Sequence, residues 1–327
     1  MIAITGGGTG GHLVIAKAIK EELNKRGIKP IFIGSTYGQD KAWFENDEGW
    51  QEIYFFETSG VVNKKGLKKI SSLTNILKYT LKTREIFKKH NITKVFSVGG
   101  YSAAPASFGA ILFKKEYFIH EQNAYMGKLN KLLSPYAKRV FSTFFHNDPY
   151  PIRDNFFELA RERKELKTII FLGGSQGAKA INDFAFKVAK MKKYKIIHQT
   201  GKLDYERCKK FYEENNLDIE FFAFDNNLIQ KIQKADFAIS RAGASTLFEL
   251  VSNQLPTLFI PYPYAAGNHQ YYNAKWLVDK NLAFLRKQDE LDLDVFDEIE
   301  NIDIISNKLK DINHKNGSKI IVDEILK

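Results

Sequence analysis

The sequence opens with a short apolar run, Ile2-Ala3-Ile4-Thr5, that passes directly into a glycine-rich turn, Gly6-Gly7-Gly8-Thr9-Gly10-Gly11-His12. Apolar and β-branched residues in a run of this length indicate a buried strand, and the residues after His12 have the apolar spacing of an amphipathic helix. Glycines let the backbone approach an anion, and a helix start presents unpaired N–H groups to it. The stretch predicts a parallel α/β fold with a ligand at its first turn.

The same alternation of short strand-like runs and longer helical segments continues along all 327 residues. We predict strands near residues 2–5, 30–34, 51–56, 94–98, 116–120 and 139–143, and a second set near 167–172, 194–199, 218–223, 236–239, 256–260 and 282–285. This order favours βαβ units and two doubly wound parallel sheets. Residues 146–163 break the periodicity with a turn-rich segment, which predicts a hinge between two domains.

Composition narrows the class of protein. The single cysteine, Cys208, allows no internal disulfide and indicates a reducing compartment. No apolar stretch reaches the roughly 20 residues of a membrane-spanning helix. The formal charge of +11 favours an anionic partner, and ten of the basic residues lie in residues 63–94, whereas residues 288–305 hold eight acids. Aromatic-rich RNA-binding signatures are absent, so we expect no nucleic-acid partner.

Three further segments carry candidate chemistry. Two are glycine loops that follow predicted strands, Gly99-Gly100-Tyr101 and Gly173-Gly174-Ser175-Gln176-Gly177, and either can hold a phosphate. In the third segment, Ser245 or Thr246 is expected to cap a helix that places Glu249 within reach of a sugar diol. The first glycine loop matches G-x-G-x-x-G, but no acid follows the second strand until Asp40, which disfavours a nicotinamide dehydrogenase.

In this order and at these separations, the segments resemble the MurG family of peptidoglycan N-acetylglucosaminyltransferases, and the likeness covers nearly the whole chain. The motifs that carry it are residues 7–12, Gly99-Gly100-Tyr101, His120-Glu121-Gln122-Asn123, residues 173–177 and residues 243–249. The resemblance implies a GT-B fold, with two Rossmann-like, doubly wound parallel-sheet domains facing across a cleft. Residues 1–150, joined by a C-terminal helix at about 313–327, would bind the acceptor and the membrane, and residues 151–312 would bind the UDP-sugar donor.

The resemblance also implies roles for individual residues. The donor-binding set is Arg153, Gly174, Ser175, Gln176, Ala244, Glu249, Gln270 and Asn273, with Glu249 on the ribose, Arg153 near the uracil and Gln270 and Asn273 at the sugar. The acceptor-binding set is Thr9, Gly10, Gly11, Gly100, Tyr101 and Asn123. The chain departs from the family pattern before Arg153, where it has Pro149-Tyr150-Pro151, and before Gln270, where it has His269.

The implied reaction is an inverting transfer of N-acetylglucosamine from UDP-N-acetylglucosamine to the muramoyl C4 hydroxyl of undecaprenyl-linked lipid I, giving lipid II. It needs a base for the acceptor hydroxyl and stabilisation of the departing diphosphate. His12, at a helix start, is the leading candidate base, and Glu121 or a water is the alternative. We expect no metal and no cofactor, because helix N-termini can hold the diphosphate. Asp292-Leu293-Asp294 resembles a metal-binding D-x-D, but it lies in the acidic run and is interpreted as a solvated face.

The basic segment of residues 63–94 predicts an amphipathic helix whose apolar stripe packs on the sheet, with Ile76 and Tyr79 outside the stripe. The resemblance implies that a few exposed apolar groups such as these, among lysines, dock on an anionic membrane surface, and we expect Lys64, Lys65, Lys68, Lys69 and nearby apolar residues to hold the domain there. The expected location is the cytoplasmic face of the cell membrane, as a peripheral protein. Alternative interpretations are another GT-B UDP-sugar transferase, a UDP-sugar epimerase, or an inactive glycosyltransferase-like subunit that recruits partners to the membrane.

Overall fold

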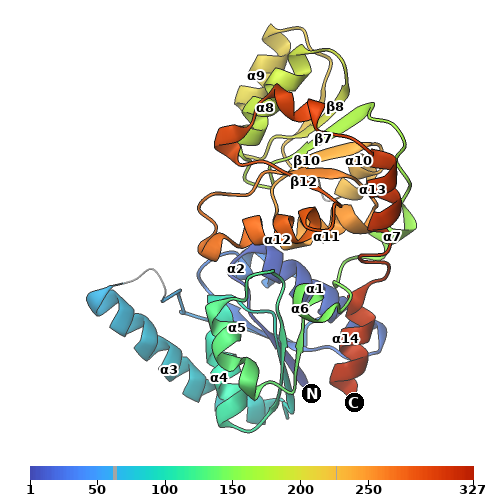
Figure 1. The fold of residues 1–327 in the computed structure, drawn as a ribbon. Coiled ribbons are helices and arrows are strands. Elements are labelled where there is room, and N and C mark those ends of the chain that lie inside the picture. The colour runs from blue at the N-terminus through green and yellow to red at the C-terminus, as the bar shows by residue number, and fades with distance from the viewer. Residues whose placement is uncertain (62–64, 226) are drawn as a thin grey trace. The chain divides into compact units, whose positions relative to one another are not determined.

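The structure is a computed structural model that describes residues 1–61, 65–225 and 227–327 (Figure 1). The chain divides into two compact units. Unit 1 consists of Met1–Ile152 and Asn316–Lys327, and unit 2 consists of Arg153–Lys315. Each unit contains one six-stranded parallel sheet, so the predicted α/β fold with two doubly wound sheets is confirmed.

The sheet of unit 1 has the strand order β3-β2-β1-β4-β5-β6. Its strands are β1 (Ile2–Thr5), β2 (Ile31–Ser35), β3 (Glu52–Phe56), β4 (Lys94–Ser97), β5 (Glu116–His120) and β6 (Arg139–Phe141). Its helices are α1 (Gly10–Lys25), α2 (Asp40–Phe44), α3 (Gly66–Lys89), η1 (Tyr101–Ala103), α4 (Ala104–Leu112), α5 (Lys128–Leu133), η2 (Ser134–Tyr136), α6 (Thr143–His146) and α14 (Gly317–Leu326). The chain leaves β3 and returns to the other side of β1, so the order of connections reverses between β1 and β4.

The sheet of unit 2 repeats this plan in the order β12-β11-β10-β7-β8-β9, with the reversal between β7 and β10. Its strands are β7 (Thr168–Leu172), β8 (Lys195–Gln199), β9 (Glu220–Phe222), β10 (Phe237–Ser240), β11 (Thr257–Phe259) and β12 (Phe284–Leu285). Its helices are α7 (Asn155–Glu158), α8 (Lys179–Lys190), α9 (Tyr205–Glu214), α10 (Leu228–Ile232), α11 (Ala244–Ser252), η3 (Ala266–Asn268), α12 (His269–Val278), η4 (Gln288–Glu290), η5 (Leu293–Asp297) and α13 (Ile302–Leu309).

All twelve predicted strands are present within a few residues of their predicted positions. They were visible in the sequence because strands of a parallel sheet are covered on both faces and therefore have continuous apolar runs. In unit 1, alternate residues of the strands, among them Ala3, Ile33 and Val95, pack against Phe87 of α3 and Ala106 of α4. The carboxyl ends of the strands, from which the glycine loops emerge, are held in place by this core.

The C-terminal helix α14 belongs to unit 1 and packs against α1 (Figure 1). Arg26, at the end of α1, forms an ion pair of 2.7 Å with Asp323. The N–H of Gly317 donates a 3.1 Å hydrogen bond to the carbonyl of Tyr150, and a Cβ on Gly317 would collide with the carbonyl of Pro149. The two segments that connect the units are therefore joined inside unit 1.

Helix α3 does not lie as the sequence predicted. Its apolar stripe points to solvent: Leu67 is 84% exposed, and Ile70, Leu73, Leu77 and Leu81 are also exposed. The face turned inward is made of Ser72, Thr80, Thr83, Ile86 and Phe87. Tyr79, predicted to lie outside the packed stripe, stacks on Phe56 with ring centroids 4.6 Å apart, and Ile76 is partly buried. The prediction of a sheet-facing stripe is wrong, because small hydroxyl-bearing residues allow close packing that periodicity does not register.

Candidate donor and acceptor sites

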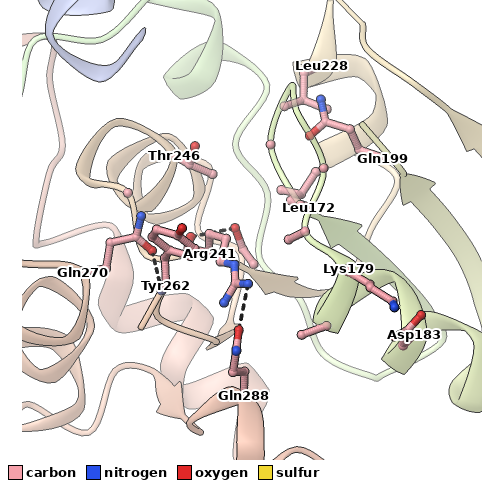
Figure 2. A pocket seen from close by; sticks show the side chains of 17 residues that line it. Leu172, Lys179, Asp183, Gln199, Leu228, Arg241, Thr246, Tyr262, Gln270 and Gln288 are labelled. Carbon is pink, nitrogen blue, oxygen red and sulfur yellow. Dashed lines mark hydrogen bonds between the residues drawn. The ribbon is translucent and has the colours of Figure 1, made fainter. Parts of the chain in front are cut away.

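Unit 2 contains a pocket of about 770 Å³ at the reversal point of its sheet (Figure 2). The carboxyl ends of β7 and β10 form its floor through Leu172 and Ser240, and the starts of α8 and α11 border it. Ligands of doubly wound sheets bind at this point, where helix N-termini present N–H groups to an anion. The pocket is therefore the candidate nucleotide-sugar site.

The glycine loop after β7 forms one side of the pocket. A Cβ on Gly177 would lie 2.5 Å from the carbonyl oxygen of Thr200, so this glycine allows the loop to press against the next loop of the sheet. The N–H of Lys202 donates to the carbonyl of Ser175 at 3.0 Å and fixes the same contact. Gly174 lines the pocket, and a Cβ there would meet nothing within 4 Å. Ser175 and Gln176 are exposed beside it.

Arg241, which the sequence prediction left without a role, provides a fixed cation in the pocket (Figure 2). Its guanidinium donates to the carbonyls of Ile260 and Pro261, at 3.0 and 3.1 Å, and to Oε1 of Gln288 at 3.1 Å. Burial lowers the pKa of Arg241. No acid among the described residues forms an ion pair with it. The sequence signal that could have identified Arg241 is its position directly after β10, one of the two strands at the reversal point.

Helix α11 carries Glu249. The helix starts at Ala244, which is buried, and its N-cap is Gly243, so the prediction that Ser245 or Thr246 caps it is wrong. Burial raises the pKa of the Glu249 carboxyl to about 7, and the positive charge of Arg153 lowers it. Arg153 is exposed at the first position of unit 2, with its guanidinium over the ring of Phe156. The charge of Arg153 thus acts on Glu249, and both residues belong to the predicted donor-binding set.

The two predicted sugar-binding residues of α12 have different environments. Gln270 lines the pocket, and its Oε1 accepts a 2.9 Å hydrogen bond from the N–H of Tyr262, so its amide has a fixed orientation (Figure 2). Asn273 is 0% exposed, and its Nδ2 donates to the carbonyl of Ala242 at 3.1 Å. Asn273 therefore supports the loop that precedes α11 from inside and does not lie on the pocket wall.

In unit 1, the loops after β1 and β4 interlock through their glycines. The N–H of Gly7 donates to the carbonyl of Gly99 at 3.1 Å. A Cβ on Gly6 would collide with the carbonyl of Gly99, and one on Gly100 would collide with that of Gly7. Much of the glycine content of the first loop thus serves this contact between neighbouring loops at the reversal point of the sheet.

The predicted acceptor and catalytic residues lie at this edge of unit 1. Thr9 is the N-cap of α1, and its Oγ1 lies 2.9 Å from Nδ1 of His12, while Gly10 and Gly11 form the first turn. Nε2 of His12 lies 3.5 Å from the position that a Cβ on Gly99 would occupy. The ring of Tyr101 covers Gly8, where a Cβ would lie 2.6 Å from Cε1 of the ring.

Glu121, the second catalytic candidate, is 2% exposed and holds its own loop together. Its carboxylate accepts hydrogen bonds from the N–H groups of Asn123 and Gly127, at 3.0 and 2.9 Å, and from Nδ2 of Asn130 at 2.9 Å. Burial raises its pKa. A carboxylate with these three donors is well suited to fixing the loop that carries Asn123. Burial also lowers the pKa of the neighbouring His120 to about 3, so that ring is neutral.

The acidic run does not form a metal cluster in the described part of the chain: no group of three or more His, Cys, Asp or Glu side chains could hold an ion there. The D-x-D-like Asp292 accepts from the N–H of Leu293 at 2.9 Å and pairs with Lys187 at 3.0 Å on the surface.

Known proteins match the whole chain. Residues 2–142 match the family model described as "Glycosyltransferase family 28 N-terminal domain", and residues 168–325 match the one described as "Glycosyltransferase family 28 C-terminal domain". A relative from Campylobacter fetus is 54% identical, with 100% of each chain covered, and one from Nitratiruptor sp. is 55% identical over 92% of this chain and 93% of its own. Both are described as UDP-N-acetylglucosamine--N-acetylmuramyl-(pentapeptide) pyrophosphoryl-undecaprenol N-acetylglucosamine transferases.

Solved structures of other proteins have a similar fold over the whole chain. The crystal structure of Acinetobacter baumannii MurG has a TM-score of 0.80 at 26% identity, over 100% of this chain and 98% of its own. A UDP-GlcNAc 2-epimerase from Neisseria meningitidis shares the fold alone, with a TM-score of 0.62 at 15% identity over 100% of both chains. The two parallel sheets and these neighbours define a GT-B glycosyltransferase fold. The chain belongs to glycosyltransferase family 28, among the MurG N-acetylglucosaminyltransferases.

Proposed function

We propose that this protein transfers N-acetylglucosamine from UDP-N-acetylglucosamine to the muramoyl C4 hydroxyl of lipid I, with inversion at the anomeric carbon, and so makes lipid II. The observation that carries the proposal is the pocket of unit 2, where Arg241 and the starts of α8 and α11 surround a space large enough for a nucleotide-sugar. The description of the full-length relatives supports the same reaction.

In the proposed donor complex, the diphosphate lies between Gly174 and Gly243, where added Cβ atoms would meet nothing and the backbone is open to a ligand. Ser175 and Gln176, exposed beside Gly174, would bind its oxygens. Lys179 and Arg241, which line the pocket, would provide the opposite charge. This preorganised set stabilises the negative charge that develops on the UDP leaving group. Glu249 accepts from the ribose hydroxyls, Arg153 lies on the uracil side and Gln270 binds the sugar.

In the proposed acceptor complex, unit 1 supplies the base. His12 is partly exposed, Oγ1 of Thr9 lies 2.9 Å from its Nδ1, and we assign to its Nε2 the removal of the proton from the C4 hydroxyl. We prefer His12 to Glu121, because the Glu121 carboxylate already accepts three hydrogen bonds, two from N–H groups of its own loop and one from Asn130 of α5. Asn123, Gly100 and Tyr101 lie on the same edge and would contact the acceptor.

The test is to mix the purified protein with UDP-N-acetylglucosamine and a lipid I analogue and to follow UDP release and the disaccharide product. We expect release of UDP that depends on the analogue. Release of UDP together with an epimerised sugar, without any disaccharide, would instead indicate a UDP-sugar epimerase. The absence of both products in a folded sample that binds UDP would favour the non-catalytic alternative.

We also propose that α3 attaches the protein to the cytoplasmic leaflet. Among the described residues no helix is both long and apolar enough to cross a membrane. The exposed stripe of α3 runs from Leu67 to Leu81 and is flanked by exposed Lys65, Lys68 and Lys69. Apolar side chains ringed by lysines suit an anionic bilayer surface, since each basic residue near it contributes about 1 kcal/mol. Lys64, which belongs to the same prediction, lies outside the described residues.

Sedimentation with anionic and with neutral vesicles tests this proposal. Changing Lys65, Lys68 and Lys69 to Glu should abolish binding to anionic vesicles, and high salt should weaken binding of the parent. A variant with Lys209→Glu and Lys210→Glu, two exposed lysines of α9 in unit 2, is the matched control and should bind as the parent does. Binding that ignores lipid charge and the three substitutions would contradict the proposal.

A further inference from the structure

A buried carboxylate occupies the first glycine loop from inside the protein. Asp40, the first residue of α2, is 0% exposed. Its Oδ1 accepts a short hydrogen bond from the N–H of Gly8, and its Oδ2 accepts from the N–H of Ser35, at the end of β2, at 2.9 Å. No Lys, Arg or His of the described residues forms an ion pair with it. Burial raises the pKa of the Asp40 carboxyl, whereas the N–H groups of Gly8 and Ser35 lower it, so these two donors favour the ionised form.

Two glycines, Gly7 and Gly34, lie against the carboxylate of Asp40. A Cβ on Gly7 would collide with Oδ1, and one on Gly34 would lie 2.9 Å from Oδ2. Gly38, two residues before Asp40, has a φ of +80°, and a Cβ there would lie 2.5 Å from the hydroxyl of Tyr101 and 2.8 Å from the carbonyl oxygen of Gly8. The first glycine loop therefore packs against the side chain of Asp40 at Gly7 and Gly8.

The hydrogen bonds lead from Asp40 to the candidate base. Gly8 directly precedes Thr9, which is the N-cap of α1 and whose Oγ1 lies 2.9 Å from Nδ1 of His12. Asp40 holds Gly8 against the end of β2 and so fixes the backbone that orients Thr9. We propose that Asp40 is a positioning residue: it serves as an internal anion that holds the first glycine loop in the conformation in which Thr9 orients His12. The proposal rests on the proposed function for the role of His12.

The chain offers a substitution and a matched control. Asp40→Asn keeps the size of the side chain but presents an NH₂ group to one of the two N–H donors. Asp47→Asn changes another partly buried acid of unit 1, which bonds Nζ of Lys20 at 2.6 Å and Nε1 of Trp50 at 3.0 Å, away from the glycine loop. Gly7→Ala is a second variant that keeps the charge of Asp40 and displaces the carboxylate by steric contact.

The experiment measures kcat, the KM for UDP-N-acetylglucosamine, the affinity for UDP and the melting temperature of all four proteins. We expect Asp40→Asn and Gly7→Ala to lose about tenfold to a hundredfold in kcat with UDP affinity within about twofold of the parent, because the donor pocket lies in unit 2. Asp47→Asn should lower the melting temperature and leave kcat within about twofold. If Asp40→Asn and Gly7→Ala keep the parent kcat, the inference is overturned.

A readout independent of turnover separates this inference from the proposed function. In ¹⁵N-histidine NMR spectra, the ring signals of His12, assigned with His12→Gln, should shift in Asp40→Asn and stay in place in Asp47→Asn. If the parent lacks transferase activity, the proposed function fails, while a His12 shift still supports the positioning role of Asp40. Unchanged His12 signals in a folded Asp40→Asn sample would overturn that role whatever the activity.

Discussion

The glycine loops after β1 and after β7 occupy equivalent places in the two units, but different groups lie against their backbones. Each follows the first strand of its sheet at the reversal point, and each presses a glycine against a neighbouring loop. The β1 loop is closed, because Asp40 takes the N–H of Gly8 and the ring of Tyr101 covers it. The β7 loop is open at Gly174 and borders a pocket with Arg241 as a fixed cation.

The difference shows that glycine spacing alone does not identify a phosphate site. In the β1 loop a side chain takes the N–H of Gly8, which leaves fewer donors for an external anion, and this contact depends on a residue distant in sequence. In the β1 loop the anion comes from α2, 32 residues away from Gly8. We therefore assign donor binding to the open loop and catalysis to the closed one, and the following predictions test this division.

The largest expected effect is on turnover, from His12 beside the closed loop. His12→Ala should lower kcat by about 100 to 10,000-fold, because a general base contributes about that much to the rate. UDP affinity should stay within about twofold, since the donor pocket belongs to the other unit. Steady-state kinetics and calorimetry measure the two effects. A variant that keeps the parent turnover would move the base elsewhere, and Glu121→Gln would be the next substitution.

Removing Arg241, the cation beside the open β7 loop, should lower the affinity for UDP. Arg241→Ala should weaken UDP binding by about 10 to 150-fold, since a hydrogen bond to a charged group contributes about 1.5 to 3 kcal/mol. Arg286→Ala is the control, because Arg286 bonds the carbonyl of Leu285 and pairs with Glu298 and does not line the pocket. Equal UDP affinities for the parent and a folded Arg241→Ala protein would remove Arg241 from the donor site.

Glu249 should make donor binding depend on pH. Its pKa of about 7 predicts that the ionised form, which accepts from the ribose, increases about tenfold between pH 6 and pH 8, and UDP affinity should rise with it. Glu249→Gln should bind UDP more weakly and keep only the pH dependence of UDP itself. Calorimetry at several pH values compares the slopes, and equal slopes for the two proteins would contradict the assignment.

The same shift predicts a change in stability, and its sign follows from the raised pKa. Between the ordinary value of 4.5 and about 7, the folded chain keeps a proton on Glu249 that the unfolded chain releases, so Glu249 lowers the stability of the ligand-free protein increasingly as the pH rises. Glu249→Gln should therefore gain melting temperature relative to the parent at pH 8 and gain little at pH 5. A difference that does not grow with pH would contradict the shift.

The smallest effects come from a pair of glycines with the same backbone strain. Gly100 and Gly174 have φ values of +79° and +82°, so alanine at either position costs about 1 kcal/mol in conformational strain. In Gly100→Ala the added methyl group also collides with the carbonyl of Gly7. This variant should therefore lose about 1 to 3 kcal/mol more of the free energy of unfolding than Gly174→Ala. Equal melting temperatures of the two variants would show that the closed loop yields to the added methyl group.

Sequence reasoning recovered the strands and the glycine loops, because both depend on residues that are neighbours in the chain. It failed where distant residues decide the outcome. The exposed stripe of α3 could not be distinguished from a packed one, since Ser72, Thr80 and Thr83 form the inner face. Likewise, in the sequence Asp40 shows only that the ribose-binding acid expected at the end of the second strand is absent. Its contact with Gly8 is formed only in the folded chain.

The predicted site residues show the same limit. Gly174 and Gln270 line the pocket of unit 2, whereas Asn273 supports the loop before α11 from inside. A motif identifies the residue types that a site needs, but which of them reach the ligand depends on side-chain packing. Arg241 gained its role only when the fold placed its guanidinium in the pocket.

The division between the two loops is tested most directly by hydrogen–deuterium exchange of the whole chain with and without saturating UDP. We predict slower exchange in the peptides that cover residues 173–180 and 243–250, and unchanged exchange over residues 5–12, where Asp40 already takes the Gly8 N–H. Protection of residues 5–12 equal to or greater than that of residues 173–180 would contradict the account, because it would place the diphosphate in the loop that the structure shows to be closed.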